Sequence, residues 1–138
     1  GQNAAVYGRL LEELAAFGMP AQVVAAVSDA ADAHLLEAIF ARHAPALAEG
    51  SALHLVAQDG TGKRAALVEA LRVVRAQAPP PHAQLVLMDG DTLLQPGTLA
   101  GCARVLAAFA DLGAVTCDNR PLVRGGAATR EWYRLRMA

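Results

Sequence analysis

The sequence predicts an α/β fold in which a parallel sheet is flanked by helices. Short runs that are continuously apolar alternate along the chain with longer segments whose apolar residues recur at helical spacing. Strands that are apolar at every position are typical of parallel sheets, because helices cover both faces of such a sheet. The length of 138 residues fits one domain, and the hydrophobic fraction of 54% can supply its core.

Composition excludes several classes of protein. Twelve basic and 13 acidic residues give a formal net charge of −1. Disordered chains combine low hydrophobicity with high net charge, and dedicated nucleic-acid binders are normally basic, so neither class fits. No run reaches the roughly 18 uncharged apolar residues that a membrane span needs.

The two cysteines do not match a disulfide scaffold or a zinc site, because such frameworks need several cysteines or histidines in close pairs. Cys102 and Cys117 both stand among apolar residues, which predicts that they are packed in the core. The four histidines are scattered without metal-ligand spacing and are expected to be surface or packing residues.

Two helix–strand pairs are predicted in the first half of the chain. Apolar residues at helical spacing between positions 6 and 17 predict a helix, and the run 23–27 predicts a buried strand. Asp32 is expected to cap a second helix. The inner face of that helix is expected to hold Leu35, Leu36, Ile39 and Phe40. The run 53–57 predicts the second strand.

Two further helices and strands are predicted in the second half. A helix follows the turn 58–63, and its predicted inward residues are Leu67, Ala70, Leu71 and Val74. A loop with three prolines precedes the predicted strand 85–88. Pro96 suits the first turn of a fourth helix. The inward residues there are expected to be Leu99, Cys102, Ala103, Leu106 and Phe109. The run 114–117 predicts a fourth strand.

The end of the chain differs from the rest. Residues 118–138 hold five arginines against Asp118 and Glu131, a net charge of +3, and they include the single tryptophan, Trp132. We therefore expect an α/β core over 1–117 and a basic, aromatic tail over 118–138.

Polar residues follow three of the predicted strands. They are Asp29, the turn 59–63, and the pair Asp89 and Asp91. In an open parallel sheet, ligands bind beyond the carboxyl ends of the strands, so a common edge predicts a binding site. Taken singly, each of these residues is also explained as a helix cap or a turn residue.

Lys63 is the only lysine of the chain, and it follows the turn Gly60-Thr61-Gly62 at the start of a predicted helix. Amide groups and the helix dipole favour an anion there, and lysine suits phosphate; an ordinary solvated lysine is the alternative. The turn departs from the P-loop pattern, because Ala57 and Arg64 replace the required glycine and hydroxyl residue.

The sequence Asp89-Gly90-Asp91 places two carboxylates at the end of a predicted strand. Such a pair can hold a hard divalent cation that takes its remaining ligands from water and a diphosphate. The alternative is a plain turn. A phosphoacceptor receiver domain is excluded, because it needs a lysine after a later strand.

Several motifs together resemble family 2 glycosyltransferases. Gly60-Thr61-Gly62-Lys63-Arg64 resembles their Gly-Lys-Arg segment, and Met88-Asp89-Gly90-Asp91-Thr92 resembles their Asp-x-Asp motif. The string Val123-Arg124-Gly125-Gly126, followed by Glu131-Trp132, resembles the membrane-integrated polysaccharide synthases of this family. The first two motifs look most like the alginate (mannuronan) polymerase branch. The resemblance covers about residues 23–138.

The resemblance implies a partial GT-A domain, a Rossmann-like fold that binds a nucleotide sugar, with a Mg²⁺ or Mn²⁺ ion. Asp29 would then approach the nucleobase or ribose, and Gly62 and Lys63 the nucleotide. Asp89 would contact the ribose, the diphosphate or the metal, and Asp91 the metal. Ser28-Asp29 departs from the paired aspartates that are usual in the family.

The implied function is donor binding in an enzyme that transfers a sugar from a nucleotide diphosphate sugar to a growing polysaccharide. The general base is expected downstream of Ala138. The whole protein is expected in the inner membrane with this domain on the cytoplasmic face, and this piece is expected to be soluble and to self-associate through its truncated surface. The residues alone leave open a nucleotide- or partner-binding α/β module without glycosyl transfer.

Overall fold

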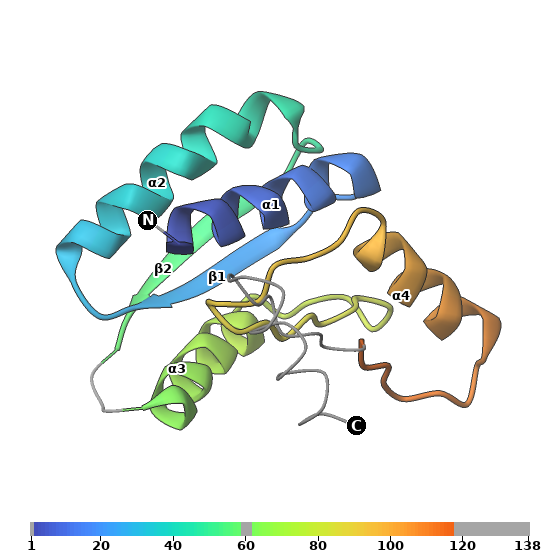
Figure 1. Cartoon of the computed structure of the whole chain (residues 1–138). Coiled ribbons are helices and arrows are strands. Elements are labelled where there is room, and N and C mark those ends of the chain that lie inside the picture. The colour runs from blue at the N-terminus through green and yellow to red at the C-terminus, as the bar shows by residue number, and fades with distance from the viewer. Residues whose placement is uncertain (1, 59–61, 118–138) are drawn as a thin grey trace, which may run out of the picture.

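The computed structural model describes residues 2–58 and 62–117 as a mixed α/β fold. Its elements are α1 (Gln2–Phe17), β1 (Gln22–Val27), α2 (Ala30–His43), the short 3₁₀ helix η1 (Ala44–Ala46), β2 (Ala52–Ala57), α3 (Lys63–Ala76) and α4 (Thr98–Ala108). In Figure 1, α1 and α2 cover one face of the two-stranded sheet and α3 lies against the other. The predicted class, a parallel sheet flanked by helices, is confirmed.

The strands β1 and β2 form one β–α–β unit with α2 as the crossover. They pair in parallel over their whole length, from Gln22 opposite Ala52 to Val27 opposite Ala57. A parallel pair needs such a crossover, because the chain must return to the end of the sheet from which it started. The two strands predicted from apolar runs are therefore present, within one residue of the predicted bounds.

The core lies between α1, α2 and the sheet. Tyr7, Leu11 and Ile39 are its most buried cluster, and partly buried residues pack around them: Ala4, Leu10, Leu14, Val23, Leu36, Phe40, Leu47 and Leu53. Of the predicted apolar stripe of α1, Val6 is buried and Leu10 and Leu14 pack against this cluster, but the central residues of the helix are Tyr7 and Leu11 beside that stripe.

The cap of α2 corrects one prediction. Asp29, not Asp32, is the N-cap, because Asp29 has extended backbone angles and its Oδ1 accepts from the backbone N–H of Asp32 at 2.8 Å. Asp32 lies in the first turn. Leu35 was also wrongly placed on the inner face: it is exposed, while Leu36, Ile39 and Phe40 face the core.

The third and fourth predicted strands are absent from the described residues. The runs 85–88 and 114–117 have no strand pairing, and Leu85, Val86 and Leu87 are 56–61% exposed. An apolar run favours a strand, but a strand also needs a neighbour to pair its backbone groups. The sheet of the described chain therefore has two strands, not four.

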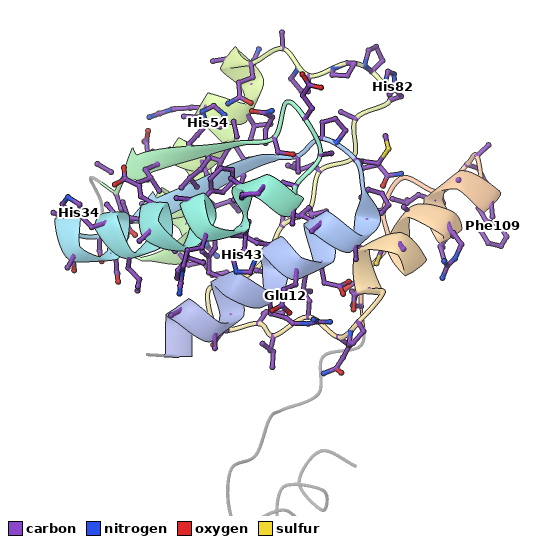
Figure 2. The ribbon with its side chains drawn as sticks, turned by 90° about the horizontal axis from the view of Figure 1, so that it is seen from above. Glu12, His34, His43, His54, His82 and Phe109 are labelled. Atoms are coloured by element: carbon purple, nitrogen blue, oxygen red, sulfur yellow. The ribbon has the colours of Figure 1, made fainter. Side chains whose placement is uncertain are left out.

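The inner faces of α3 and α4 also differ from the prediction. Leu67 and Leu71 are exposed, whereas Ala70 and Val74 are half-buried. At α4, Leu99 is buried as predicted and Cys102, Ala103 and Leu106 are half-buried, but Phe109 is 58% exposed and points outward in Figure 2. The helical spacing of apolar residues predicts which of them share a face of the helix. The neighbouring helices and strands decide which of those residues are buried.

Two more predictions near α4 are corrected. Pro96 precedes Gly97, which is the N-cap in a left-handed conformation, so Pro96 lies outside the first turn. Cys117 is exposed and Cys102 only half-buried, so the pair does not belong to the core. The histidines lie far apart, as expected, and Figure 2 shows His34, His54 and His82 in different regions of the molecule.

The predicted tail 118–138, with Trp132, lies outside the described residues, as do positions 59–61. Of the helices that the structure describes, none combines the length and apolar character needed to cross a membrane.

Candidate functional site

The carboxyl ends of β1 and β2 lie together at one edge of the sheet. Val27 pairs with Ala57, and the backbone N–H of Gln58 donates to the carbonyl of Val27 at 3.0 Å. Asp29 follows β1, and Gly62 and Lys63 follow β2. The topology therefore brings the two loops to the edge where ligands bind in open α/β sheets.

The start of α3 is open to an anion. Gly62 is the N-cap and has φ +93°, a conformation that side-chain-bearing residues rarely adopt. Within residues 2–58 and 62–117, no side chain caps the helix, and the N–H groups of its first turn are not used within the helix itself. Lys63 is the first residue of the helix and adds a positive charge to the positive end of the dipole.

Lys63 and Asp89 form an ion pair across this edge. The Nζ atom of Lys63 lies 2.5 Å from Oδ2 of Asp89, and the two side chains are 74% and 48% exposed. These residues are 26 positions apart, so tertiary structure alone brings them together. Two of the residues predicted for the site are thus in direct contact.

Asp91 lies two residues beyond Asp89 on an exposed turn. The turn is closed by the N–H of Thr92, which donates to the carbonyl of Asp89 at 3.0 Å. The carboxylate of Asp91 has no hydrogen bond or ion pair within the described residues. It is therefore open to solvent and to a ligand.

The two aspartates fit a hard divalent cation that the protein holds with few ligands. Within residues 2–58 and 62–117, no three side chains of histidine, cysteine, aspartate or glutamate gather in a group able to hold a metal. Mg²⁺ is commonly bound by one or two carboxylates together with waters and substrate phosphates. The donor set here has that composition, with Oδ2 of Asp89 shared with Lys63.

Asp29 has a structural role. Its carboxylate caps α2 through the N–H of Asp32 at 2.8 Å, and no interaction joins it to Lys63 or Asp89 in the described structure. The structure therefore groups Lys63, Asp89 and Asp91, while Asp29 lies after the neighbouring strand.

Two residues of α1 that the sequence did not single out contact the segment after Asp91. Arg9 Nε donates to the carbonyl of Leu94 at 3.1 Å, and Glu13 accepts from the N–H of Gly97 at 2.9 Å. Arg9 and Glu13 also pair with each other at 3.1 Å. Their i,i+4 spacing is visible in the sequence, but it is equally typical of an ordinary pair on a helix surface.

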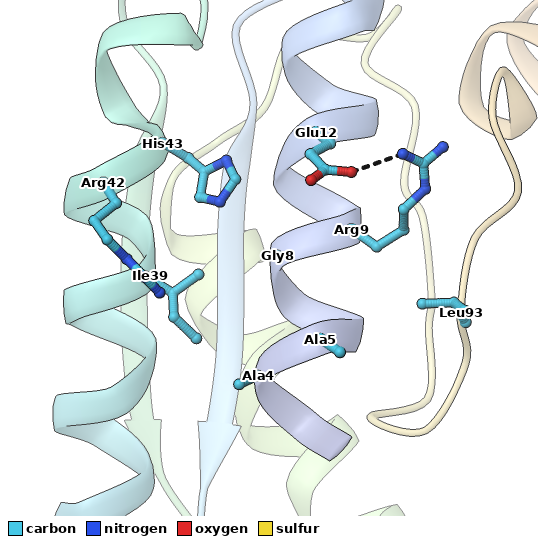
Figure 3. A pocket seen from close by; sticks show the side chains of 9 residues that line it. All are labelled: Ala4, Ala5, Gly8, Arg9, Glu12, Ile39, Arg42, His43 and Leu93. Atoms are coloured by element: carbon cyan, nitrogen blue, oxygen red, sulfur yellow. Dashed lines mark hydrogen bonds and ion pairs between the residues drawn. The ribbon is translucent and has the colours of Figure 1, made fainter. Parts of the chain in front are cut away.

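A cavity of about 450 Å³ lies between α1 and α2, and Leu93 of this segment belongs to its lining. Figure 3 shows its lining, with Arg9 and Glu12 of α1 joined by an ion pair, His43 of α2 opposite, and Leu93 at one side. None of Asp29, Lys63, Asp89 and Asp91 lines it. The cavity adjoins the segment after Asp91 through Leu93 and through Arg9, which contacts Leu94.

Comparison with known proteins shows the family of this chain. A family model described as "Glycosyltransferase like family 2" matches residues 2–138. The chain belongs to this family of glycosyltransferases. The prediction of a family 2 glycosyltransferase is therefore confirmed, and the alternative of a module without glycosyl transfer is not favoured.

Two relatives of this family 2 chain carry the name "Glycosyltransferase alg8". One, from Pseudomonas syringae pv. tomato, is 31% identical over 136 residues, which cover 99% of this chain and 27% of the relative. The other, from Azotobacter vinelandii, is 30% identical over 94 residues, which cover 68% of this chain and 19% of the relative. The chain thus spans about a quarter of the length of the first relative. These matches support the predicted alginate polymerase branch. No solved structure matches the chain.

Proposed function

We propose that this chain is the donor-binding part of a glycosyltransferase that transfers a sugar from a nucleotide diphosphate sugar to a growing polysaccharide. The observation that carries the proposal is the Lys63–Asp89 ion pair beside Asp91, at the start of α3, in a chain of the glycosyltransferase family.

Charge explains why a cation belongs to this site. The side chains of Asp89 and Asp91 carry two negative charges and Lys63 carries one positive charge, so the three together repel a diphosphate. A divalent cation between the carboxylates and the phosphates reverses that balance. Mg²⁺ or Mn²⁺, held by Asp91 and Asp89, would supply that charge and neutralise the diphosphate leaving group as the glycosidic bond forms.

The residues of this chain would then bind and orient the donor. The N–H groups of the first turn of α3, beyond Gly62, and the ammonium of Lys63 would face the diphosphate. Lys63 would exchange its contact with Asp89 for the phosphates and so release a carboxylate oxygen for the cation. Asp29, after the neighbouring strand, would approach the nucleobase or ribose while it continues to cap α2.

For the whole protein, the proposal includes an acceptor and a place in the membrane. A growing glycan would be the acceptor, with the general base outside this chain, and the intact enzyme would be membrane-integrated with this domain on the cytoplasmic face.

The exposed run Leu85, Val86 and Leu87 would let isolated chains associate, because large exposed apolar patches favour contacts between proteins. Sedimentation of Val86→Asp against the unmodified chain tests this last point.

Nucleotide titration tests the central proposal. Uridine and guanosine diphosphates are titrated separately into the chain by calorimetry, with and without Mn²⁺. Binding of one of them that requires Mn²⁺, and that Asp91→Ala abolishes, is the expected result. Asp111→Ala, which removes an exposed acidic residue after α4, is the matched control. Binding that is indifferent to Mn²⁺ and to Asp91→Ala would refute the role of the Asp-x-Asp motif.

A further inference from the structure

We propose that Glu13 and Arg9 of α1 are positioning residues that hold the Asp89–Asp91 segment in the geometry needed for a divalent cation. This inference rests on the proposed function. It adds two residues that would orient the metal ligands without binding the cation or the nucleotide themselves. It starts from the most unusual polar side chain of the described structure, the buried carboxylate of Glu13, which is only 4% exposed.

The carboxylate of Glu13 can be buried because it has hydrogen-bond donors as partners. Its Oε1 atom accepts from the backbone N–H of Gly97 at 2.9 Å and from Nη2 of Arg9 at 3.1 Å. Arg9 is held in turn, since its Nε donates to the carbonyl of Leu94 at 3.1 Å. A buried carboxylate without such partners would be strongly unfavourable, so the side chains and the backbone of 94–97 stabilise one arrangement together.

These contacts hold one end of the segment that bears the candidate metal ligands. The other end is joined to α3 by the exposed ion pair of Lys63 and Asp89, which opens at little cost. Between Asp89 and Gly97 the chain forms neither helix nor strand, so no sheet ladder fixes it. Asp91 lies between the two attachments, three residues before Leu94.

The chemistry of the cation makes that attachment important. Mg²⁺ demands near-ideal octahedral geometry and short oxygen distances, so a small displacement of a carboxylate weakens its binding. Residues that orient metal ligands from outside typically change metal affinity about 10–100-fold when they are mutated. Removal of the Glu13 charge would weaken its bonds to Gly97 and Arg9, loosen the segment that follows Asp91 and reduce cation affinity, while the α3 contacts to the nucleotide would persist.

The chain offers a matched control on the same helix. Glu12 also pairs with Arg9, through Oε2 at 2.7 Å, but its side chain is 55% exposed, and none of the described hydrogen bonds or ion pairs joins it to 94–97. Glu12→Gln removes a charge beside Arg9 without touching the segment, whereas Glu13→Gln removes the charge that Gly97 and Arg9 share.

The test measures how nucleoside diphosphate binding depends on Mn²⁺ concentration. For Glu13→Gln, the Mn²⁺ concentration at half-maximal binding should rise about tenfold, with near-normal nucleotide affinity at saturating Mn²⁺. Glu12→Gln should match the unmodified chain. Hydrogen exchange without metal is the second readout, and the amide of Gly97 should exchange faster in Glu13→Gln than in Glu12→Gln.

The outcomes separate this inference from the proposed function. If the unmodified chain shows no Mn²⁺-dependent binding, both the proposed function and the positioning role are wrong. If it binds, but Glu13→Gln shows the same Mn²⁺ dependence as Glu12→Gln, only the positioning role is overturned. Should Glu13→Gln fail to fold, Arg9→Lys takes its place, because a lysine cannot contact Leu94 and Glu13 together as the planar guanidinium does.

Discussion

The ammonium of Lys63 lies 2.5 Å from the carboxylate of Asp89, and both groups remain largely exposed to solvent. An exposed ion pair contributes about 0–1 kcal/mol to stability, because water screens it and two side chains must be ordered. The pair can therefore open for a ligand at little cost. It links the start of α3 to the segment that carries the Asp-x-Asp motif.

The first prediction concerns Lys63. Lys63→Ala should weaken nucleoside diphosphate binding about tenfold or more, because a charge-assisted contact to phosphate is lost, and the melting temperature should hardly change. Calorimetric titration and thermal unfolding measure the two effects. Arg75→Ala, at the far end of the same helix, controls for loss of one positive charge. A large fall in melting temperature with normal binding would mark Lys63 as structural instead.

The second prediction separates two roles of Asp29. Asp29→Ala should lower the free energy of unfolding by about 1 kcal/mol, because the N–H of Asp32 loses its cap. Asp29→Asn retains a capping oxygen and should keep nearly normal stability. If Asp29 also contacts the nucleobase or ribose, Asp29→Asn should still weaken nucleotide binding. Normal binding by a stable Asp29→Asn protein would restrict Asp29 to its capping role.

The third prediction concerns Tyr7 at high pH. Its hydroxyl is buried without a hydrogen-bond partner among the described residues, and burial raises the pKa of Tyr7 from 10.0 to about 12. Below pH 10 the hydroxyl is protonated in both states. Between pH 10 and 12 the unfolded chain releases the proton more readily, so the free energy of unfolding should fall by about 2–3 kcal/mol.

Tyr7→Phe provides the comparison for that titration. Urea unfolding at several pH values should give a smaller decline above pH 10 for Tyr7→Phe than for the unmodified chain. At neutral pH the variant should be about 1 kcal/mol more stable, because the unpaired hydroxyl no longer has to be buried. Equal pH dependence of the two proteins would contradict the assigned burial.

The fourth prediction concerns Cys102 and Cys117, whose Sγ atoms lie 3.3 Å apart. Oxidised glutathione should convert them to an intramolecular disulfide: the two thiols lose two protons and two electrons, and the oxidant becomes two glutathione thiols. The hydrogen bond to Cys117 raises the pKa of the Cys102 thiol, so the reaction should accelerate as pH rises.

Closure of this short loop should raise the stability by about 3 kcal/mol at most. Thiol titration and thermal unfolding of the oxidised and reduced chains measure the reaction and its effect. Cys102→Ser and Cys117→Ser should each abolish the stabilisation. Oxidation that gives mainly covalent dimers on a non-reducing gel would mean that the two thiols do not meet within one chain.

Much of the fold followed from local pattern. The apolar residues of α1 recur at helical spacing, and the short, continuously apolar run of β1 is typical of a buried strand. The motifs around Lys63 and Asp89 also identified the family, because short polar motifs that follow apolar runs can be recognised in the sequence itself. These features depend on residues that are close in sequence, and so the sequence alone determined them.

Tertiary structure decided the features that depend on distant neighbours. The run 85–88 has the composition of a strand, but in the described chain nothing pairs with it, and pairing is a property of two segments. Phe109 continues the spacing of α4, yet no element that the structure describes covers it. Likewise, the burial of Glu13 against Gly97 arises from contacts 84 residues apart, which no local pattern of charge can specify.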